Sequence, residues 1–283
     1  AGSNPGRRRD SRLGKPGDSR NPRGHRQAGI ARPAARSYVS GEPAVVEPAA
    51  PNMRARHLLA VCLSVIPLFI FTIWFHVTRD DPLTIRQMMV YPLVIGGGAV
   101  VYMLLLLRYM CRERPSDLNL KPGRWYADVL SGVLLAVVFG AILIAGEMTL
   151  GRWLPRPPSR DIGNLIEGLA TNPLLLAIWL GPVVWIGVAG FEELSRVFLL
   201  SRLWKVWSGP GGRWGAVVLF AALFGTVHIY QGVASVIGIG IMGFVGGAYY
   251  LRFGRVWPLI IAHGLYDSIT IAVGINMVRA TGG

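Results

Sequence analysis

The sequence predicts an all-α protein, a bundle of about seven helices that cross a membrane. Of its 283 residues, 52% are hydrophobic, and the mean hydropathy is +0.43. The apolar residues form long uninterrupted blocks, whereas in a soluble protein polar residues interrupt the apolar pattern. A helix requires about 20 mostly apolar residues to cross ~30 Å of hydrocarbon, where backbone polar groups find no water. Such blocks occupy residues 57–77, 88–107, 127–150, 174–200, 213–229, 232–251 and 256–278, of which the fifth is the shortest.

A basic tail, residues 1–56, precedes the first block and is rich in Pro and Gly. It contains too little apolar surface to fold, so we expect it to be disordered. The formal charge of +14 could indicate an arm for nucleic acid or anionic lipid. We favour a solvated tail that keeps the N-terminus in the cytoplasm, and we expect no nucleic-acid partner. Met53 is also a reasonable native start, in which case the tail is an upstream extension.

The remaining chain divides into three parts. Residues 57–150 hold three accessory spans, residues 151–173 form a loop rich in Pro and Arg, and residues 174–278 form a core of four spans. The first span is retained, because its apolar run exceeds a signal peptide's and no small-x-small cleavage site follows it. Cys62 lies inside that span and Cys111 beside a basic loop, so no disulfide is expected.

Loop charges predict the orientation of the spans. With the N-terminus inside, the cytoplasmic loops, which we take to include Arg202 and Lys205, hold ten Lys or Arg, against six on the opposite side. Because Lys and Arg concentrate in cytoplasmic loops, we expect an integral multi-pass protein of a bacterial inner membrane with a cytoplasmic N-terminus. Asp128, Glu147 and Asn276 lie near span ends, where their side chains would reach water.

Three charged residues interrupt the fourth block, in "EELSR". An Asp, Lys or Arg at a span centre costs roughly 2.5–3.5 kcal/mol on insertion scales. Glu192, Glu193 and Arg196 must therefore face protein or a water-filled cavity. At 100° per residue the arginine lies between the two carboxylates and can reach either. A structural salt bridge is the alternative to a functional site.

A histidine in the fifth block lies at the same predicted depth as these carboxylates. Glu192 and His228 stand 18 residues on either side of Pro210, within the turn-forming "SGPGGR". An antiparallel hairpin there would place both about 25 Å from the turn at 1.5 Å per residue. In the last block, His263 and Asp267 are four residues apart and share a helix face. We expect all four side chains to meet in one buried polar cleft.

That set of groups fits hydrolysis of an amide by water. Such a reaction needs a base that activates the water and a donor that stabilises the oxyanion. A carboxylate is a candidate for the base. The histidines are candidates for the donor and for a second proton-transfer group.

The residues resemble the CPBP/Abi family of intramembrane endopeptidases, which includes CAAX-processing and bacteriocin-processing proteases. Its pattern is Glu-Glu-x-x-x-Arg, then Phe-x-x-x-His, then His-x-x-x-Asn or Asp. Here Phe224 and His228 in "FGTVH", and His263 and Asp267 in "HGLYD", match the second and third motifs. The resemblance covers about residues 174–278 and implies an endopeptidase acting on a membrane-associated peptide or protein.

The first motif departs from that pattern, because "EELSR" has two residues between the second Glu and Arg196 instead of three. Aligning the arginine puts Glu192 in the second glutamate's place, whereas aligning the glutamates turns Arg196 by about 100°. The resemblance implies that Glu192 or Glu193 activates water with help from His228. It implies that His263 and Asp267 form the oxyanion site. We choose Glu192 as base, with Glu193 second.

Three questions stay open at this level. Metal-free chemistry is favoured because no His-Glu-x-x-His pair occurs, but zinc on Glu192, His228 and His263 is the alternative. Carboxylates and histidines in spans also occur in proton-coupled transporters, although paired half-repeats and broken helices are not evident. An inactive scaffold or immunity protein is the third interpretation, suggested by the altered first motif.

Overall fold

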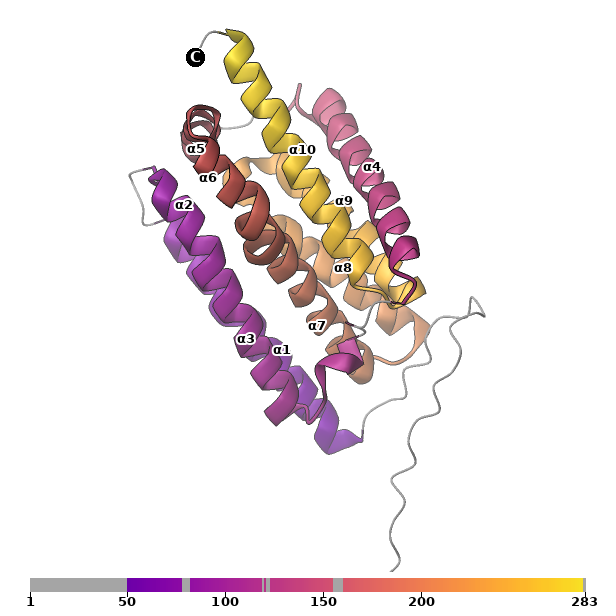
Figure 1. Cartoon of the computed structure of the whole chain (residues 1–283). Helices are drawn as coiled ribbons and strands as arrows, with labels where there is room; N and C mark the ends of the chain where they lie inside the picture. Colours follow the sequence, from indigo (N-terminus) through magenta and orange to yellow (C-terminus); the bar gives the residue numbers. More distant parts are fainter. Residues whose placement is uncertain (1–49, 78–81, 119, 121–122, 155–159, 282–283) are drawn as a thin grey trace, which may run out of the picture. The chain divides into compact units, whose positions relative to one another are not determined.

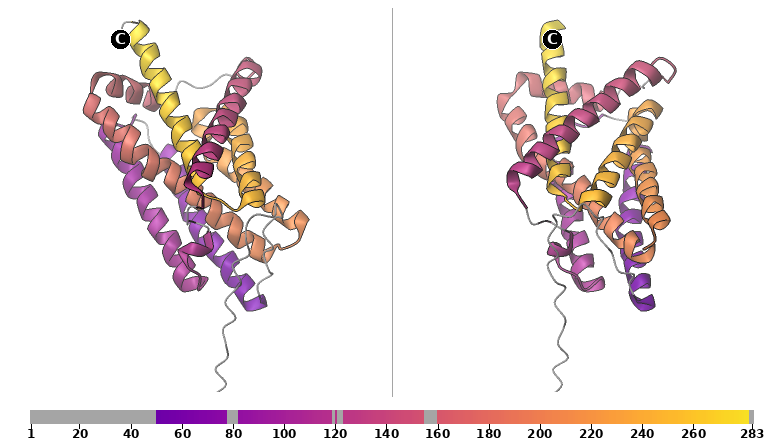
Figure 2. Two further views of the ribbon diagram at one scale, coloured as in Figure 1. Left: turned by 45° about the vertical axis from the view of Figure 1, so that its right-hand side comes forward. Right: turned by 90° about the vertical axis from the view of Figure 1, so that its right-hand side faces the viewer.

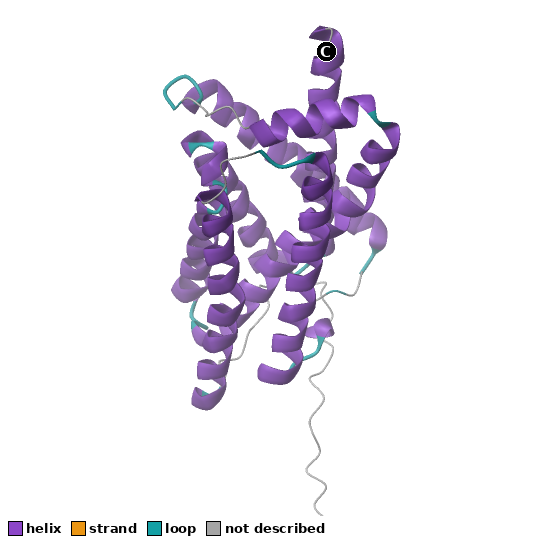
Figure 3. Ribbon diagram, turned by 90° about the vertical axis from the view of Figure 1, so that its left-hand side faces the viewer, coloured by secondary structure: helices purple, strands orange, loops and turns teal. Residues whose placement is uncertain are grey.

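The structure is a computed structural model that describes residues 50–77, 82–118, 120, 123–154 and 160–281. These residues form helices and loops and no strand, which confirms the all-α class (Figure 3). The predicted tail falls outside the described residues up to position 49. Its last residues, 51–56, belong instead to the first helix, because Pro51 suits a helix start.

The described helices belong to one compact unit (Figure 1). The α-helices are α1 (Pro51–Val77), α2 (Ile85–Tyr91), α3 (Gly97–Leu105), α4 (Trp125–Leu150), α5 (Arg160–Thr171), α6 (Pro173–Ile178), α7 (Phe191–Val206), α8 (Pro210–Thr226), α9 (Val233–Phe253) and α10 (Trp257–Thr281). Three π-helical segments join some of them: η1 (Pro92–Gly96), η2 (Leu106–Met110) and η4 (Trp179–Gly190). Two short 3₁₀ segments are η3 (Pro115–Leu118) and η5 (Ile229–Gln231).

Among the described residues, five helices are long and apolar enough to cross a membrane. They are Ile85–Met110, Trp125–Leu150, Pro173–Val206, Val233–Phe253 and Trp257–Ala280. A count of seven is not confirmed. The predicted fifth span corresponds to α8, which has only 17 residues, short of the usual length for crossing the hydrocarbon layer. The chain is an integral membrane protein.

Consecutive C-terminal helices reverse direction, whereas α4 and α10 run the same way, because Asp128 at the start of α4 pairs with Arg255 just before α10. α7 and α8 form the predicted hairpin around Gly209, α8 packs along α9, and α10 lies against α4. The turned views show α4 crossing α10 obliquely (Figure 2). The glycines of "GFVGG" permit this packing: a Cβ on Gly243 would lie 3.1 Å from Phe224 Cδ1, and one on Gly247 would lie 2.9 Å from Val217 Cγ1. Glycines at this spacing allow two helices to approach closely.

Two of the three π-helical segments, η1 and η4, touch each other. η1 packs against η4, and their backbones meet at two glycines. A Cβ on Gly96 would lie 2.5 Å from the Gly187 carbonyl oxygen, and one on Gly187 would lie 2.8 Å from the Pro92 carbonyl carbon. Gly181 has non-helical angles just before Pro182, which kinks the span. Interrupted helices, which the sequence did not make evident, are therefore present.

The predicted loop at residues 151–173 contains a helix, which corrects that expectation. α5 covers Arg160–Thr171 and buries Leu165 and Leu169. These leucines and the half-buried Ile166 recur at helical spacing, so α5 is amphipathic rather than apolar throughout. Such a helix contains no long apolar block, so apolar blocks in the sequence do not reveal it. α5 packs on α10 and α2.

Two predictions about charged residues near the span ends are wrong. Arg202 is not a loop residue but lies buried in α7, paired with Glu113 from the loop after η2. Asp128 does not reach out to water but is buried at the start of α4, paired with Arg255 from the turn before α10. In both cases a partner distant in the sequence satisfies the charge inside the protein.

Candidate active site

The two neighbouring glutamates of α7 have different surroundings. Glu193 is fully buried. Its Oε2 pairs with Arg196 Nη1, and its Oε1 lies 2.9 Å from Nδ1 of His263 on α10. Both carboxylate oxygens are therefore engaged. The three-residue spacing, which differs from the family pattern, still permits an ion pair within one helical turn.

Arg196 is held on its other sides by aromatic rings and glycine. Its Cζ lies 5.2 Å from the ring centroid of Phe220 and 5.0 Å from that of Phe224, an arrangement in which the ring faces attract the cation. A Cβ on Gly246 would lie 2.3 Å from Arg196 Nη1. α9 therefore leaves room for the guanidinium only because a glycine stands there.

Glu192 faces open space instead. Its side chain is 20% exposed, against 0% for Glu193. Nε2 of His263 lies 3.6 Å from Glu192 Oε2 and also 3.6 Å from Asp267 Oδ2. His263 thus bridges α7 and α10: Nδ1 contacts the buried carboxylate, and Nε2 lies between the two more exposed ones.

His228 lies two residues after the end of α8. Its Nδ1 is 2.8 Å from the Phe224 carbonyl oxygen. A carbonyl oxygen only accepts, so Nδ1 carries the proton and a neutral imidazole has its lone pair on Nε2. The Phe224 ring stands edge-on to the imidazole, with centroids 5.2 Å apart. The first and last residues of "FGTVH" therefore fix both the tautomer and the ring orientation.

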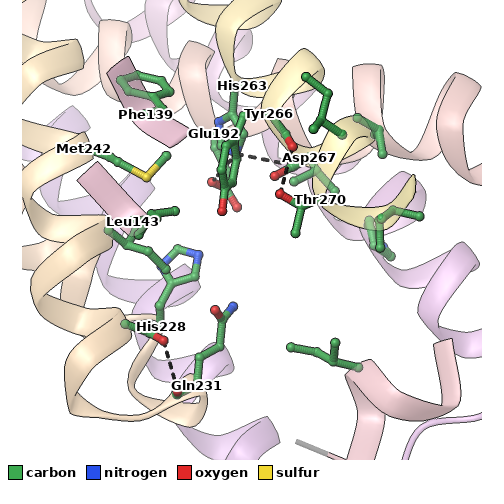
Figure 4. Close-up of a pocket in the computed structure, with 18 of the residues that line it drawn as sticks. Phe139, Leu143, Glu192, His228, Gln231, Met242, His263, Tyr266, Asp267 and Thr270 are labelled. Carbon is green, nitrogen blue, oxygen red and sulfur yellow. Dashed lines mark hydrogen bonds and ion pairs between the residues drawn. The ribbon is translucent and has the colours of Figure 1, made fainter. Parts of the chain in front are cut away.

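A single cavity of about 1180 Å³ joins these residues. All seven residues that the sequence pointed to line it: Glu192, Glu193, Arg196, Phe224, His228, His263 and Asp267. In Figure 4 His228 lies across the cavity from Glu192, His263 and Asp267. The remaining lining is mostly aliphatic and aromatic. The predicted meeting of the three motifs around one cleft is therefore present in the fold.

A known protein family matches the part of the chain that contains these site residues. Residues 173–269 match the family model described as Type II CAAX prenyl endopeptidase Rce1-like. This part of the chain, about a third of its length, is similar to the Rce1-like family. Neither a curated protein nor a solved structure matches the chain. The match confirms the resemblance to the CPBP/Abi endopeptidases and supports a membrane protease of the CAAX-processing kind.

The Rce1-like segment begins with α6 and ends within α10. It thus contains every predicted site residue. The accessory helix α4 lies outside it yet lines the cavity through Phe139, Leu143 and Glu147. Glu147, for which the sequence suggested only contact with water at a span end, is therefore part of the cavity wall.

A zinc site on Glu192, His228 and His263 does not fit the geometry. Within the described part of the chain, no three His, Cys, Asp or Glu side chains are placed to hold a metal ion. His228 lies across the cavity from Glu192 and His263 (Figure 4). The hydrogen bonds at Nδ1 of the two histidines do not decide the question, because zinc binds through Nε2 in such an arrangement.

Several polar residues of the cavity were not predicted from the sequence. Tyr230 and Gln231 follow His228 in the η5 turn, and Tyr266 and Thr270 flank Asp267 on α10. Closeness in the sequence could have identified them, because each lies within three residues of a predicted site residue. Uncharged polar side chains carry a small insertion cost, so they do not stand out in an apolar block as a carboxylate does.

Proposed function

We propose that this protein is an intramembrane endopeptidase that hydrolyses a peptide bond of a membrane-associated protein or peptide. One observation carries the proposal: the incompletely engaged carboxylate of Glu192 and His228, whose Nδ1 is hydrogen-bonded to the Phe224 carbonyl oxygen, line the same cavity among membrane-spanning helices. A base and a second proton-transfer group facing one buried space suit water-dependent hydrolysis.

The two glutamates take different roles in this proposal. Glu192 accepts the proton of the attacking water, because its carboxylate faces the cavity. Glu193 positions His263, because both of its oxygens are already engaged by Arg196 and His263. This assignment chooses between the two alignments of the altered motif by surroundings instead of by spacing.

The reaction would proceed in two proton steps. Water attacks the carbonyl carbon of the scissile bond while Glu192 takes one of its protons. The oxyanion accepts a hydrogen bond from Nε2–H of His263. This requires the doubly protonated imidazolium, because Nδ1–H already donates to Glu193; Asp267 helps to fix the ring from 3.6 Å. When the C–N bond breaks, the leaving nitrogen receives a proton from Glu192 or through His228.

Replacement of single site residues tests the proposal. We expect Glu192→Gln to abolish cleavage and His228→Ala to reduce it at least 100-fold, the usual scale of a proton-transfer group. The readout is mass spectrometry of membranes containing wild-type or variant protein, searched for peptides that change length. Farnesylated and unmodified peptides ending in Cys-Ala-Ala-X provide a direct assay of the substrate type in the family's description.

Glu167→Gln, on the exposed face of α5, is the matched control and should cleave like wild type. Cleavage that survives Glu192→Gln at full rate would refute the assigned base. Normal membrane insertion with no cleavage by any form of the protein would favour an inactive scaffold or immunity protein.

A proton-coupled transporter is the second candidate, and the kinked, π-helical span at Gly181 favours it. Interrupted helices beside buried carboxylates are typical of transport sites. Proton flux into liposomes separates the two functions. Flux that stops in Glu192→Gln, with no peptide cleavage in the wild type, would replace the peptidase by a transporter.

A further inference from the structure

The turn after α8 places a second polar side chain beside His228. Gln231 N donates to the His228 carbonyl oxygen at 2.9 Å, and Gly232 N donates to the Ile229 carbonyl oxygen at 2.9 Å. Gly232 has φ +93°, a conformation that glycine adopts at little cost, and α9 begins at the next residue. Gln231 is therefore fixed to His228 by a short closed turn, and its side chain lines the cavity (Figure 4).

The carboxamide of Gln231 is held on one side and open on the other. Its Nε2 donates to the Tyr230 hydroxyl oxygen at 2.9 Å, and the Tyr230 ring lies over His228 with centroids 6.1 Å apart. The backbone carbonyl oxygen of Gln231 accepts a hydrogen bond from Ser235 Oγ at 3.0 Å. Within the described residues, no hydrogen bond occupies Oε1 or the second N–H of the carboxamide.

An open carboxamide in this cavity matches the needs of a peptide backbone. A peptide that enters an apolar cavity loses the water bound to its N–H and C=O groups, and each group left unpaired there is costly. A carboxamide offers one donor and one acceptor in a plane, as a peptide bond does. It does not titrate, so it binds without competing for the proton that Glu192 takes.

We propose that Gln231 binds the substrate backbone through a pair of hydrogen bonds, on the His228 side of the scissile bond. The inference rests on the peptidase function proposed above and adds to it a residue that selects peptides in extended form. Gln231 would align the chain so that the scissile carbonyl lies between His228 and the carboxylates.

Gln231→Met and Gln231→Ala test this role. Methionine keeps most of the volume without the hydrogen bonds, so a folded variant remains even if alanine destabilises the turn. The probe is a proteome-derived peptide library in phosphatidylcholine liposomes, with cleavage sites read by mass spectrometry. We expect kcat/KM for the cleaved peptides to fall about tenfold or more. The pH profile of the remaining activity should keep its shape, because a change would instead indicate that Tyr230 had shifted His228.

Backbone N-methylation identifies the contact itself. In peptides cleaved by the wild type, each amide N–H near the scissile bond is methylated in turn. Methylation at one position should lower kcat/KM about tenfold in the wild type. The same methylation should not lower kcat/KM further in Gln231→Met. Thr270→Val is the matched control, since the Thr270 hydroxyl lines the cavity but donates to the Tyr266 carbonyl oxygen; it should retain the methylation penalty.

The outcomes separate this inference from the proposed function. Cleavage that requires Glu192 but is unchanged in both Gln231 variants would overturn the inference alone. If methylation at every position lowers kcat/KM by the same factor in Gln231→Met as in the wild type, the inference is also overturned. Absence of any cleavage dependent on Glu192 would overturn the peptidase proposal and this inference with it.

Discussion

At the scale of single residues, burial separates two adjacent carboxylates into a structural and a reactive group. Glu193 is fully buried between Arg196 and His263, whereas Glu192 has one fifth of its side chain exposed to the cavity. A buried charge is stable only with its partners in place. Loss of the Glu193 charge should therefore affect folding, and loss of the Glu192 charge should affect only chemistry.

Conservative replacement of each glutamate should show this difference. Glu193→Gln leaves Arg196 buried with an uncharged partner, which should cost about 3 kcal/mol of folding free energy, as breaking a buried ion pair does. Glu192→Gln should leave the melting temperature in detergent within 1–2 °C of wild type, on the scale of a surface substitution, about 0.5 kcal/mol. Thermal unfolding of both variants checks the prediction. Equal melting temperatures would mean that Glu193 does not anchor the site.

At the scale of helices, close contact between the π-helical segments η1 and η4 fixes the backbone that leads into α7. Gly187 of η4 lies five residues before Glu192, and its neighbours across the contact are backbone atoms of Pro92 and Leu93. Backbone atoms cannot rotate away as a side chain can. The direction in which the carboxylates point therefore depends on a contact between η1 and η4, partly outside the family segment.

Gly187→Ala should disturb this contact. The new Cβ would lie 2.8 Å from the Pro92 carbonyl carbon, and overpacking of this kind typically costs about 1–3 kcal/mol. We expect a lower melting temperature together with at least a tenfold loss of activity, because α7 shifts. Gly146→Ala on α4 is the control, since its Cβ would meet nothing within 4 Å. Wild-type behaviour of Gly187→Ala would show that the contact does not position the site.

A second cluster of charges joins α1, α7 and the loop after η2. Glu113 pairs with Arg202 and Lys205, and His57 Nε2 lies 3.7 Å from Glu113 Oε1. Burial raises the pKa of Glu113, but the charges and hydrogen bonds of Arg202 and Lys205 outweigh that effect, so the net pKa lies below its ordinary value of 4.5. A carboxyl group whose folded pKa is depressed stabilises the fold above the unfolded pKa.

This cluster should make stability depend on acid pH. At pH 7 Glu113→Gln should melt below wild type, because Arg202 and Lys205 lose the charge of their partner. The difference should persist down to about pH 4.5 and disappear as the pH falls through the lowered folded pKa. Melting curves of both proteins between pH 3 and 7 measure it. A constant difference across that range would contradict the assignment to Glu113 ionisation.

Particular residues show how far the sequence predicts this helix arrangement. The turn at Pro210 and the rise per residue were enough to place Glu192 and His228 on one cavity, because an α-hairpin has fixed dimensions. Which glutamate faces the cavity was not predictable, because it depends on His263 in α10, 70 residues away. The π-helical segments were also invisible, since a helix that is apolar all round has no periodic pattern to interrupt.

At the scale of the whole molecule, α4 separates two connecting segments, one before its first residue and one after its last. The loop before it, which holds η3, follows Glu113 and its basic partners. The segment after it leads to α5, whose exposed face carries Glu167. Because α4 is long enough to span the membrane, these two connections lie on different sides. The excess of Lys and Arg in the loops predicts that the first connection lies in the cytoplasm.

Labelling of single cysteines should confirm that orientation. With Cys62 and Cys111 replaced by Ser, we expect Ser116→Cys in η3 to react with an impermeant maleimide only in inverted vesicles. Glu167→Cys in α5 should react in intact spheroplasts. Both positions are exposed, so accessibility and not burial decides the result. Reversed labelling would mean that Lys and Arg in the loops do not set the topology, and that the cavity's polar wall at His228 and Gln231 faces the cytoplasmic side.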